Sequence, residues 1–370
     1  MKVLFINYHP VDPYIVFNTA KAIENDGGET FFLIVEKENI IKTIVDSNGF
    51  DNEVIGSAKV SFTGKIFNIL NIVRKINKRI LEFNPDIIFS PASPYTSLAC
   101  KFNKLPLVSW EDTETATFNY KFSHNRINSL LVIEPFYKPL LLDNVIRFNG
   151  YKELAYLHPR WFKPDMSVLK DLGLEMDDKI VLMRFSALNA MHDLGLKSEA
   201  DTNDKKILNF IKKMQSDYGA KIFISVTERN LDDRFDAYKL TIDPSKYVHL
   251  LSFCSLYIGE GTTTASEAGV LGVPWIVLRD KPLGYLIDQE ENYGLGFRTE
   301  DIDEALEKAA LYLSNDNIKK EWAIKRSRLL IDKIDVSSFL TWFLRDYPES
   351  HRMMKDNPEY QNKFKYTTKS

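Results

Sequence analysis

Short apolar runs alternate with longer amphipathic stretches through the first half of the chain. The short runs are typical of buried strands, and apolar residues that return every three to four positions are typical of helices. Strands are expected at residues 3–6, 31–35, 87–89 and 107–108, and helices near residues 14–24, 65–83 and 95–102. Nearly continuous apolar strands joined by amphipathic helices predict a parallel sheet with helices on both faces.

The same pattern begins again in the second half of the chain. Strands are expected at residues 179–183, 222–226, 256–258 and 275–278, and helices near residues 205–214 and 265–271 and from residue 301 onward. The repeated order predicts a second parallel sheet. The expected fold is therefore α/β, with two Rossmann-like, doubly wound domains that face a central cleft at the carboxyl ends of their strands, where such sheets bind ligands.

The stretch between the two patterns, "YKELAYLHPRWFKPDMSVLKDLGL", has no sheet periodicity and contains Pro159 and Pro164. Proline-bearing stretches of this kind are typical of linkers. The apolar segment "SSFLTWFLRDYP" near the end of the chain is a candidate to return to the first domain. The expected divisions are an N-terminal domain, a linker, a C-terminal domain and a C-terminal helix with its tail, at residues 1–150, 151–165, 166–335 and 336–370.

A turn rich in glycine and threonine, "GEGTTTASEAGVLGVP", lies between an expected strand and an expected helix. The free N–H groups at a helix N-terminus and the positive end of its macrodipole favour an anion. A phosphate is therefore expected at Thr262, Thr263 and Thr264. In the alternative interpretation these residues form a capping box, in which Glu267 folds back onto the Thr264 N–H.

The same segment resembles the C-terminal-domain signature of the GT-B-fold nucleotide-sugar enzymes, which include glycosyltransferases and non-hydrolysing UDP-N-acetylglucosamine 2-epimerases. The resemblance covers the whole chain in architecture but only a few short windows in sequence. It implies that Gly261, Thr262 and Thr263 contact a diphosphate and that Glu267 binds both ribose hydroxyls. From "NGYKELAYLHP" through "MRFSALNAMHDLG" the chain more closely resembles an uncharacterised prokaryotic GT-B-like family.

Two segments distinguish the transferase and epimerase branches of that superfamily. The epimerases carry a His-x-Glu-Ala-Gly-Leu-Arg signature after a strand of the first domain, where this chain has "VSWEDTETATFN". The segment "LRDKPLGY" also lacks the Thr-Glu-Arg that follows the equivalent Arg-Asp in epimerases. The sequence therefore favours glycosyl transfer, or an uncharacterised relative, over epimerisation.

Three carboxylates, Glu111, Asp112 and Glu114, follow the expected strand at residues 107–108. An inverting transferase needs a base, and a partly buried carboxylate whose pKa is raised can remove the proton of an acceptor hydroxyl. Asp112 and Glu114 are the preferred catalytic candidates. In the alternative interpretation, Asp112 or Thr113 caps the next helix and Glu114 is an acid of its first turn.

Arg184, in "MRFSALNAMHDLG", follows the first expected strand of the second domain. A fixed cation there would neutralise the charge that develops on a departing diphosphate, as the GT-B resemblance implies, without a metal ion. His192 and Asp193 are candidates to orient a phosphate or a sugar hydroxyl. The alternatives are an interdomain salt bridge for Arg184 and an exposed loop position for His192.

His9, in "NYHPVD", ends the first expected strand and is a further catalytic candidate, for acceptor binding or base catalysis. A histidine needs only a small pKa shift to be neutral near pH 7. A histidine before a proline is, however, also typical of a structural turn. His124 and Glu228 are weaker candidates for residues of the cleft.

The composition describes a globular protein of 370 residues, long enough for two cores, with 44% hydrophobic and 27% charged residues. A formal net charge of −3 gives no reason to expect a nucleic-acid partner. Cys100 and Cys254 lie in apolar runs without metal-ligand spacing, as expected of reduced thiols in the cytoplasm. The helix at 65–83 has a basic face, which suits either peripheral contact with an anionic membrane or ordinary solvation.

The sequence thus predicts a cytoplasmic, metal-independent enzyme that transfers sugar from a UDP-linked donor to a saccharide or lipid-linked acceptor, in surface polysaccharide or glycoconjugate assembly. No cofactor is expected, and any membrane association would be peripheral, at the inner face of the plasma membrane. The alternatives are an epimerase-like enzyme and a nucleotide-sugar-binding protein without turnover. An acidic side chain from residues 111–114 that reaches the cleft would favour an enzyme over the binding protein.

Overall fold

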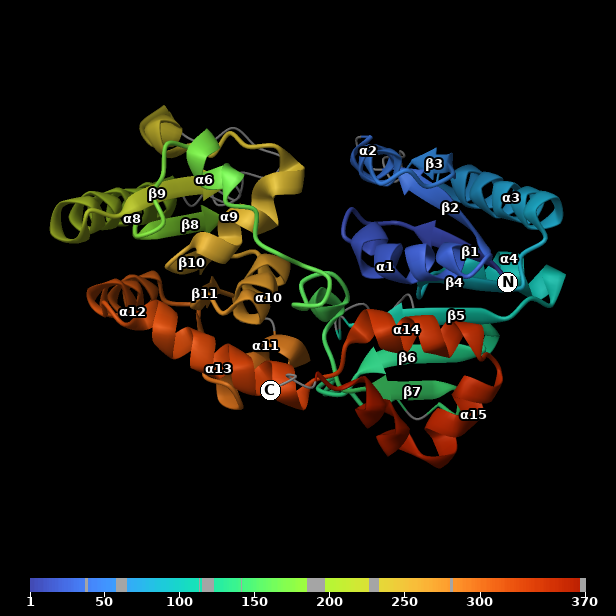
Figure 1. Cartoon of the computed structure of the whole chain (residues 1–370). Coiled ribbons are helices and arrows are strands. Elements are labelled where there is room, and N and C mark those ends of the chain that lie inside the picture. Colours follow the sequence, from blue (N-terminus) through green and yellow to red (C-terminus); the bar gives the residue numbers. More distant parts are fainter. Residues whose placement is uncertain are drawn as a thin grey trace. The chain divides into compact units, whose positions relative to one another are not determined.

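The computed structural model describes residues 1–36, 39–57, 65–112, 114, 123–140, 142–184, 197–225, 233–279 and 282–366. The chain forms two compact units, here called unit 1 (Met1–Trp161 with Ile331–Ser370) and unit 2 (Phe162–Leu330). It passes from one to the other after Trp161 and again inside helix α13 (Ile318–Asp332). Figure 1 labels the elements of both units.

Unit 1 is built on a seven-stranded sheet. Its strands are β1 (Lys2–Asn7), β2 (Glu29–Glu36), β3 (Asn52–Ser57), β4 (Ile87–Pro91), β5 (Leu107–Glu111), β6 (Ser129–Ile133) and β7 (Val145–Phe148). Its helices are α1 (Asp12–Asn25), α2 (Ile40–Ser47), α3 (Lys65–Phe83), α4 (Pro94–Asn103), α14 (Val336–Arg345) and α15 (Glu349–Asp356), with 3-10 turns η1 (His124–Arg126), η2 (Lys152–Ala155) and η5 (Pro358–Phe364).

The strand order β3-β2-β1-β4-β5-β6-β7 reverses direction between β1 and β4, and every pair is parallel. Because parallel crossovers are right-handed, α1 and α2 cover one face and α3 and α4 the other. Figure 1 shows α14 beside α1, on the same face. Strands β1 and β6 are buried along almost their whole length, as expected of a sheet covered on both sides.

Unit 2 is built on a five-stranded sheet. Its strands are β8 (Ile180–Arg184), β9 (Lys221–Ser225), β10 (Leu256–Gly259), β11 (Trp275–Leu278) and β12 (Gly296–Thr299). Its helices, besides most of α13, are α6 (Ser167–Asp171), α8 (Lys197–Tyr218), α9 (Tyr247–Phe253), α10 (Thr262–Leu271), α11 (Gly284–Glu291) and α12 (Ile302–Ser314), with 3-10 turns η3 (Asp233–Tyr238) and η4 (Pro244–Lys246).

The order of this sheet, β12-β11-β10-β8-β9, reverses between β8 and β10, and all pairs are parallel. Alternate strand residues, among them Met183, Ile258 and Ile276, enter one core with α8 and α12. Since neighbouring residues of a strand face opposite ways, Arg184 and Tyr257 belong to the face that carries α10. The predicted α/β class with two doubly wound parallel sheets is confirmed.

Each expected strand or helix lies within an observed one or begins or ends one residue outside it, and α3 has the predicted bounds. Several elements were not expected, notably α2, β3, β6, β7 and β12. Of the linker expected at 151–165, the part up to and including Trp161 belongs to unit 1, where Tyr151, Leu154 and Leu157 are buried. The apolar segment near the C-terminus forms α14, which packs against α1 of unit 1.

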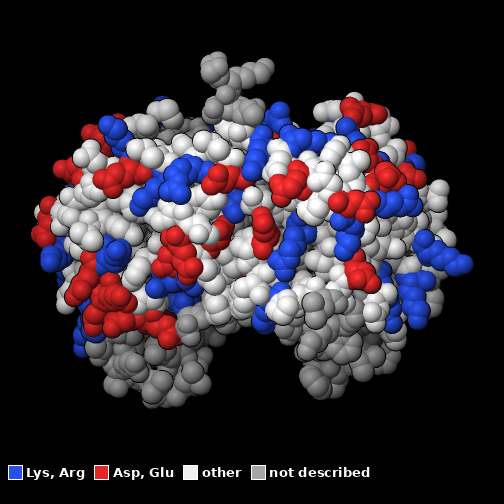
Figure 2. Space-filling model, turned by 90° about the horizontal axis from the view of Figure 1, so that it is seen from below, with Lys and Arg blue, Asp and Glu red and all other residues white. Residues whose placement is uncertain are grey.

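The outward face of α3 combines apolar and basic side chains. Leu70 and Leu81 are exposed, as are Arg74 and Lys78, although Lys78 lies 3.6 Å from the Glu82 carboxylate. Figure 2 shows acidic and basic residues interspersed on the face seen there. Among the described residues, no helix combines the length and apolar character that crossing a membrane requires. Peripheral contact through α3 stays a prediction, which co-sedimentation with anionic vesicles tests.

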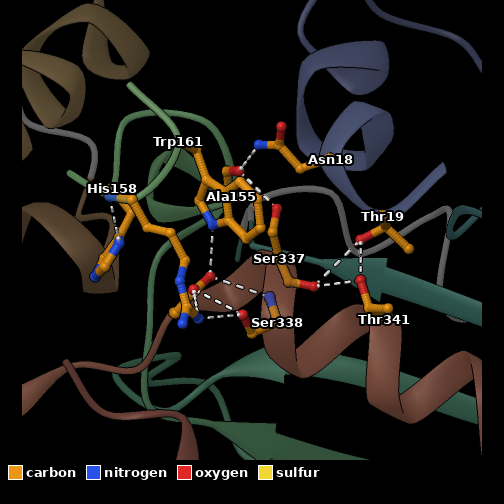
Figure 3. Close-up of polar contacts among 10 residues, drawn as sticks. Asn18, Thr19, Ala155, His158, Trp161, Ser337, Ser338 and Thr341 are labelled. Atoms are coloured by element: carbon orange, nitrogen blue, oxygen red, sulfur yellow. Dashed lines mark hydrogen bonds and ion pairs between the residues drawn. The ribbon is translucent and has the colours of Figure 1, made fainter. Parts of the chain in front are cut away.

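A buried polar network fixes α14 on unit 1 (Figure 3). Ser337 Oγ and Asn18 Nδ2 both donate to the Ala155 carbonyl, at 2.6 and 2.8 Å. At the start of the helix, Asp335 is the N-cap residue and accepts hydrogen bonds from Ser338 N at 3.0 Å and Trp161 Nε1 at 2.8 Å. The C-terminal segment is therefore held by directed contacts as well as by its apolar face.

Replacing Asp335 with alanine should destabilise unit 1 by about 2–3 kcal/mol, because it removes a cap and leaves the Trp161 N–H without its acceptor. The matched control is Asp301→Ala, at the N-cap of α12, where the carboxylate is exposed and accepts from Asp303 N and Glu304 N. That change should cost about 1 kcal/mol. Urea unfolding measures both, and equal losses would show that the contacts with Trp161 contribute nothing.

Candidate functional site

The glycine- and threonine-rich turn of unit 2 connects β10 to α10. Helix α10 begins at Thr262, and Gly261 is its N-cap residue in an extended conformation. Thr262, Thr263 and Thr264 therefore form the first turn, whose N–H groups have no acceptor within the helix. Because a capping box requires threonine at the N-cap, the alternative interpretation of Thr264 and Glu267 is wrong: Glu267 is the sixth residue of the helix.

Two glycines of this turn are required by close packing against β8 and against a side chain of β10. A Cβ atom at Gly259 would lie 2.0 Å from the Arg184 carbonyl oxygen, and one at Gly261 would lie 2.7 Å from the Tyr257 hydroxyl. The turn is held there by two hydrogen bonds, from Glu260 N to Arg184 O at 2.9 Å and from Tyr257 Oη to Gly261 O at 3.0 Å. The backbone before α10 is therefore fixed, and it carries no side chain at Gly259 or Gly261.

Arg184 brings a positive charge to the first turn of α10. It is the last residue of β8, it pairs with Gly259 of β10, and its Nη1 donates to Thr264 Oγ1 at 3.0 Å. Its guanidinium also lies 5.8 Å from the centre of the Tyr247 ring. Burial raises the pKa of Tyr247 and that of Tyr257, so both phenols are neutral. The positive potential at this helix end is thus not cancelled by a neighbouring phenolate.

Glu267 places a carboxylate one turn further along α10. It lies three residues after Thr264, on the same side of the helix, and is 8% exposed. Its charge interacts with Arg184, Tyr247 and Tyr257, so these four side chains share one environment. A cation with free N–H groups can bind a phosphate, and the carboxylate can accept hydrogen bonds from neighbouring hydroxyls of the same ligand.

A second network fixes the far side of α10. Gln289 of α11 donates to Ser266 Oγ at 2.9 Å and accepts from Trp275 Nε1 at 3.1 Å. A Cβ atom at Gly269 would lie 1.9 Å from Gln289 Oε1, so the helix and this amide are in direct contact. Helix α10 is therefore positioned by β11 and α11 independently of any ligand.

In unit 1, Asp112 belongs to a buried charged cluster. It follows β5 and forms an ion pair with Lys152 of η2, whose Nζ also lies 3.8 Å from Glu153 Oε1. Asp112, Lys152 and Glu153 are 4%, 7% and 1% exposed. Asp12, at the start of α1, is a further buried acid of this cluster, because its charge interacts with those of Lys152 and Asp112.

Asp12 was not among the candidates from the sequence. Its Oδ2 accepts from Tyr8 N and from His9 N, each at 2.8 Å, which braces the turn after β1. Burial raises its pKa to about 7, against the lowering effect of those hydrogen bonds and of the Lys152 charge. Asp12 therefore exchanges a proton near neutral pH, a property that acid–base catalysis requires.

The other predicted catalytic residues lie outside this cluster. Glu114 is fully buried, and its Oε1 accepts from Tyr137 N at 3.4 Å while its carbonyl accepts from Lys138 Nζ at 2.6 Å. The His9 side chain is exposed and its Nδ1 accepts from Val11 N at 3.4 Å. His124 lies in the 3-10 turn η1.

Three sequence candidates, His192, Asp193 and Glu228, lie outside the described residues. Within the described part of the chain, no group of three or more histidine, cysteine or acidic side chains is placed to hold a metal ion. The structure thus brings the candidates of the α10 turn together with Arg184 in unit 2. In unit 1 it joins Asp112 to three residues that the sequence did not indicate, Asp12, Lys152 and Glu153.

Comparison with solved structures shows that the chain has a fold similar to that of several UDP-GlcNAc 2-epimerases and of MurG. A UDP-GlcNAc 2-epimerase from Neisseria meningitidis, bound to UDP-GlcNAc, superposes with a TM-score of 0.65 at 13% identity over 93% of this chain and 100% of its own. One from Methanocaldococcus jannaschii gives 0.63 at 12% identity over 89% and 99%. MurG from Acinetobacter baumannii gives 0.58 at 12% identity over 93% and 99%. The GT-B resemblance of the sequence is confirmed as a likeness of fold.

Comparison of sequences adds a family. A search of curated proteins found no match. A family model described as "Protein of unknown function (DUF354)" matches residues 11–337, which include the described residues of both candidate sites. The chain therefore belongs to the DUF354 family.

Proposed function

We propose that this protein is a glycosyltransferase, which binds a UDP-linked sugar against unit 2 and transfers the sugar to a saccharide or lipid-linked acceptor. The observation that carries the proposal is the meeting of three groups near the start of α10: the N–H groups of its first turn, the guanidinium of Arg184 from β8 and the Glu267 carboxylate. Support also comes from the structural relatives, three of which are bound to UDP or UDP-GlcNAc.

In this proposal each part of the donor has a partner. The diphosphate lies at Thr262, Thr263 and Thr264, where the glycines before the helix admit it and Arg184 offsets its charge. The two ribose hydroxyls donate to Glu267. When the sugar leaves, the bond from its anomeric carbon to the diphosphate breaks, and the fixed cation and helix N-terminus stabilise the negative charge that UDP acquires.

The acceptor step requires a base. The acceptor oxygen bonds to the anomeric carbon while its proton passes to a carboxylate, and we assign that role to Asp112 or Asp12 of unit 1. Asp12 suits it because its pKa is about 7. His9 is exposed and stays in the proposal as an acceptor-binding residue. Glu114 is not assigned the role of base, because its Oε1 already accepts a hydrogen bond from Tyr137 N. The cytoplasm and polysaccharide assembly remain the proposed setting.

The buried cluster also favours a second candidate, a UDP-N-acetylglucosamine 2-epimerase. Epimerisation removes a proton from one face of sugar carbon 2 and returns one to the other, which calls for paired acids that titrate near neutral pH. Asp12, with a pKa of about 7, is one such acid, and its charge interacts with that of Asp112. The segment at 108–119 lacks the epimerase signature, so transfer remains our preferred function.

A thermal-shift screen tests the function. UDP and UDP-N-acetylglucosamine should raise the melting temperature in the presence of EDTA, because a ligand at 100 times its Kd stabilises the folded state by about 2.7 kcal/mol. ADP and GDP are the matched controls. If no nucleoside diphosphate stabilises the protein, or only with magnesium or manganese, the proposed site is wrong.

Product analysis then separates the candidates. UDP-N-acetylglucosamine incubated with the protein alone should remain unchanged, and addition of a saccharide acceptor should release UDP. Formation of UDP-N-acetylmannosamine without an acceptor would establish the epimerase instead. Tight binding with neither product, across a panel of donors and acceptors, would favour the binding protein without turnover.

A further inference from the structure

A cavity of about 410 Å³ lies in unit 1, apart from the residues assigned to the proposed reaction. It is formed on one side by β7 and the residue after β6, and on the other by α15 and η5. Figure 1 shows α15 next to β7, at the edge of the sheet. Small-molecule sites typically enclose about 300–1,000 Å³, so the cavity is large enough for one or two sugar rings.

The sheet side of the cavity is an unpaired strand edge. In the described sheet β7 pairs with β6 alone, so its outer backbone groups face the C-terminal segment. Just after β7, the backbone groups of this edge are hydrogen-bonded to the C-terminal segment: Asn149 N donates to Gln361 Oε1 at 2.7 Å, and Ile334 N donates to Asn149 O at 2.9 Å. The remainder of β7, including Val145 and Arg147, lines the cavity.

The charges around the cavity favour an anion. Three cations, Arg147, Lys355 and Lys365, line it with two carboxylates, Glu134 and Glu359. Among the described residues none of the three cations has a carboxylate within 4.0 Å. Glu359 accepts a hydrogen bond from the Asn362 amide, which reduces its capacity to neutralise a neighbouring cation.

Arg147 is held in place before any ligand binds. Its Nη1 donates to the carbonyls of Glu134 and Phe136 at 3.0 and 2.9 Å. Nε and Nη2 have no partner in the part of the chain that the structure describes, and a guanidinium presents five N–H donors in a rigid plane. A carboxylate or phosphate can therefore bind the remaining donors at little cost in side-chain entropy.

The side-chain amides that line the cavity favour a ligand that carries hydroxyl groups beside its anionic group. Asn149 Nδ2 donates to the Asp332 carbonyl at 3.1 Å, which fixes the orientation of the amide. Its Oδ1 is buried and accepts no hydrogen bond from any described residue. A buried acceptor without a donor is unfavourable, and a ligand hydroxyl would supply the donor. Met354 and Pro358 offer apolar contact to the C–H side of a ring.

We propose that this cavity binds an anionic saccharide unit, whose carboxylate or phosphate meets Arg147 and Lys365 and whose hydroxyls meet Asn149 and its neighbouring amides. The site is separate from the nucleotide site on α10, and its occupation does not depend on the proposed transfer reaction. Through this cavity, unit 1 would hold a charged sugar polymer or glycoconjugate by a sugar residue other than the one that reacts.

Calorimetry on the full chain with four probes tests this site. D-glucuronate and D-glucose 6-phosphate should bind at least tenfold more tightly than D-glucose and inorganic phosphate, because only the first two combine an anionic group with hydroxyls. Absence of binding by both charged sugars at 20 mM would overturn the proposal. Equal affinity for inorganic phosphate would also overturn it, since the site would then bind anions without recognising a sugar.

Two lysines of the same segment provide the variant and its control. Lys365 lines the cavity, whereas Lys363, two residues earlier, donates to the Tyr360 hydroxyl and packs on aromatic rings. Lys365→Gln should weaken glucuronate binding at least fivefold and Lys363→Gln should not. Both should bind UDP as the parent does, so failure here is distinguishable from failure of the nucleotide site. Equal glucuronate affinity of the two variants would place the ligand elsewhere.

Discussion

Replacing Lys152 with methionine is expected to destabilise unit 1 by about 3–5 kcal/mol, because the change leaves buried carboxylates without their cation. Lys152 is 7% exposed, forms the ion pair with Asp112 and interacts with the charge of Asp12. Methionine fills a similar volume, so the loss reports the charge and not a cavity. Urea unfolding followed by circular dichroism gives the free energy, and a loss below about 1 kcal/mol would contradict the account.

The pH dependence of that loss provides a second test. Burial raises the pKa of Asp12 to about 7, above that of the unfolded chain. Between roughly pH 4 and that value the folded protein binds more protons than the unfolded one, so its stability falls as the pH rises through this window. Without Lys152 the pKa should rise further, and the variant should lose more stability at pH 8 than at pH 5. The double variant with Asp112→Leu should recover part of the loss.

The variant Glu267→Gln is expected to fold normally and to lose about 1.5–3 kcal/mol of UDP affinity, or roughly 10- to 150-fold in Kd. Glutamine keeps the shape of the side chain but offers one amide oxygen, where the carboxylate offers two acceptors for two ribose hydroxyls. The matched control is Glu291→Gln, an exposed position on α11. Calorimetry measures both, and a similar Kd for the two variants would remove Glu267 from the ribose site.

The fold could be predicted from the sequence wherever burial is periodic. Strands such as β1 and β10 are apolar runs between amphipathic helices, and α3 repeats its apolar residues with helical spacing. Strand β12 gave no such signal, because its sequence GFRT contains one apolar side chain and its position depends on Gly296. A Cβ atom there would lie 2.0 Å from the Trp275 ring, a contact that no local pattern encodes.

The candidate site of unit 2 was predictable because its groups are close in sequence. Glycines, threonines and Glu267 occupy nine consecutive positions, and Arg184 ends the strand beside them. The start of α10 was placed too late, since threonines have weak helix propensity and only the observed backbone identifies Gly261 as the N-cap.

The cluster of unit 1 could not be predicted in the same way. Asp12, Asp112 and Lys152 come from separate elements, and each has an ordinary local interpretation: a first-turn acid, a helix cap and a linker lysine. Only the parallel order of β1, β4 and β5, with η2 following β7, brings their charges together. The site is formed by contacts between segments that are distant in the sequence, and such contacts cannot be inferred from the local patterns of a single sequence.

The central claim is that the α10 turn and Glu267 bind the ribose diphosphate of a nucleotide sugar. Its most direct test is a calorimetric cycle in which UDP and 3′-deoxy-UDP are each titrated into the parent protein and into Glu267→Gln. If Glu267 holds the hydroxyl, the parent loses affinity when the hydroxyl is removed and the variant loses little more, so the two effects are not additive. Additive effects, or a parent that binds both nucleotides equally, would contradict the claim.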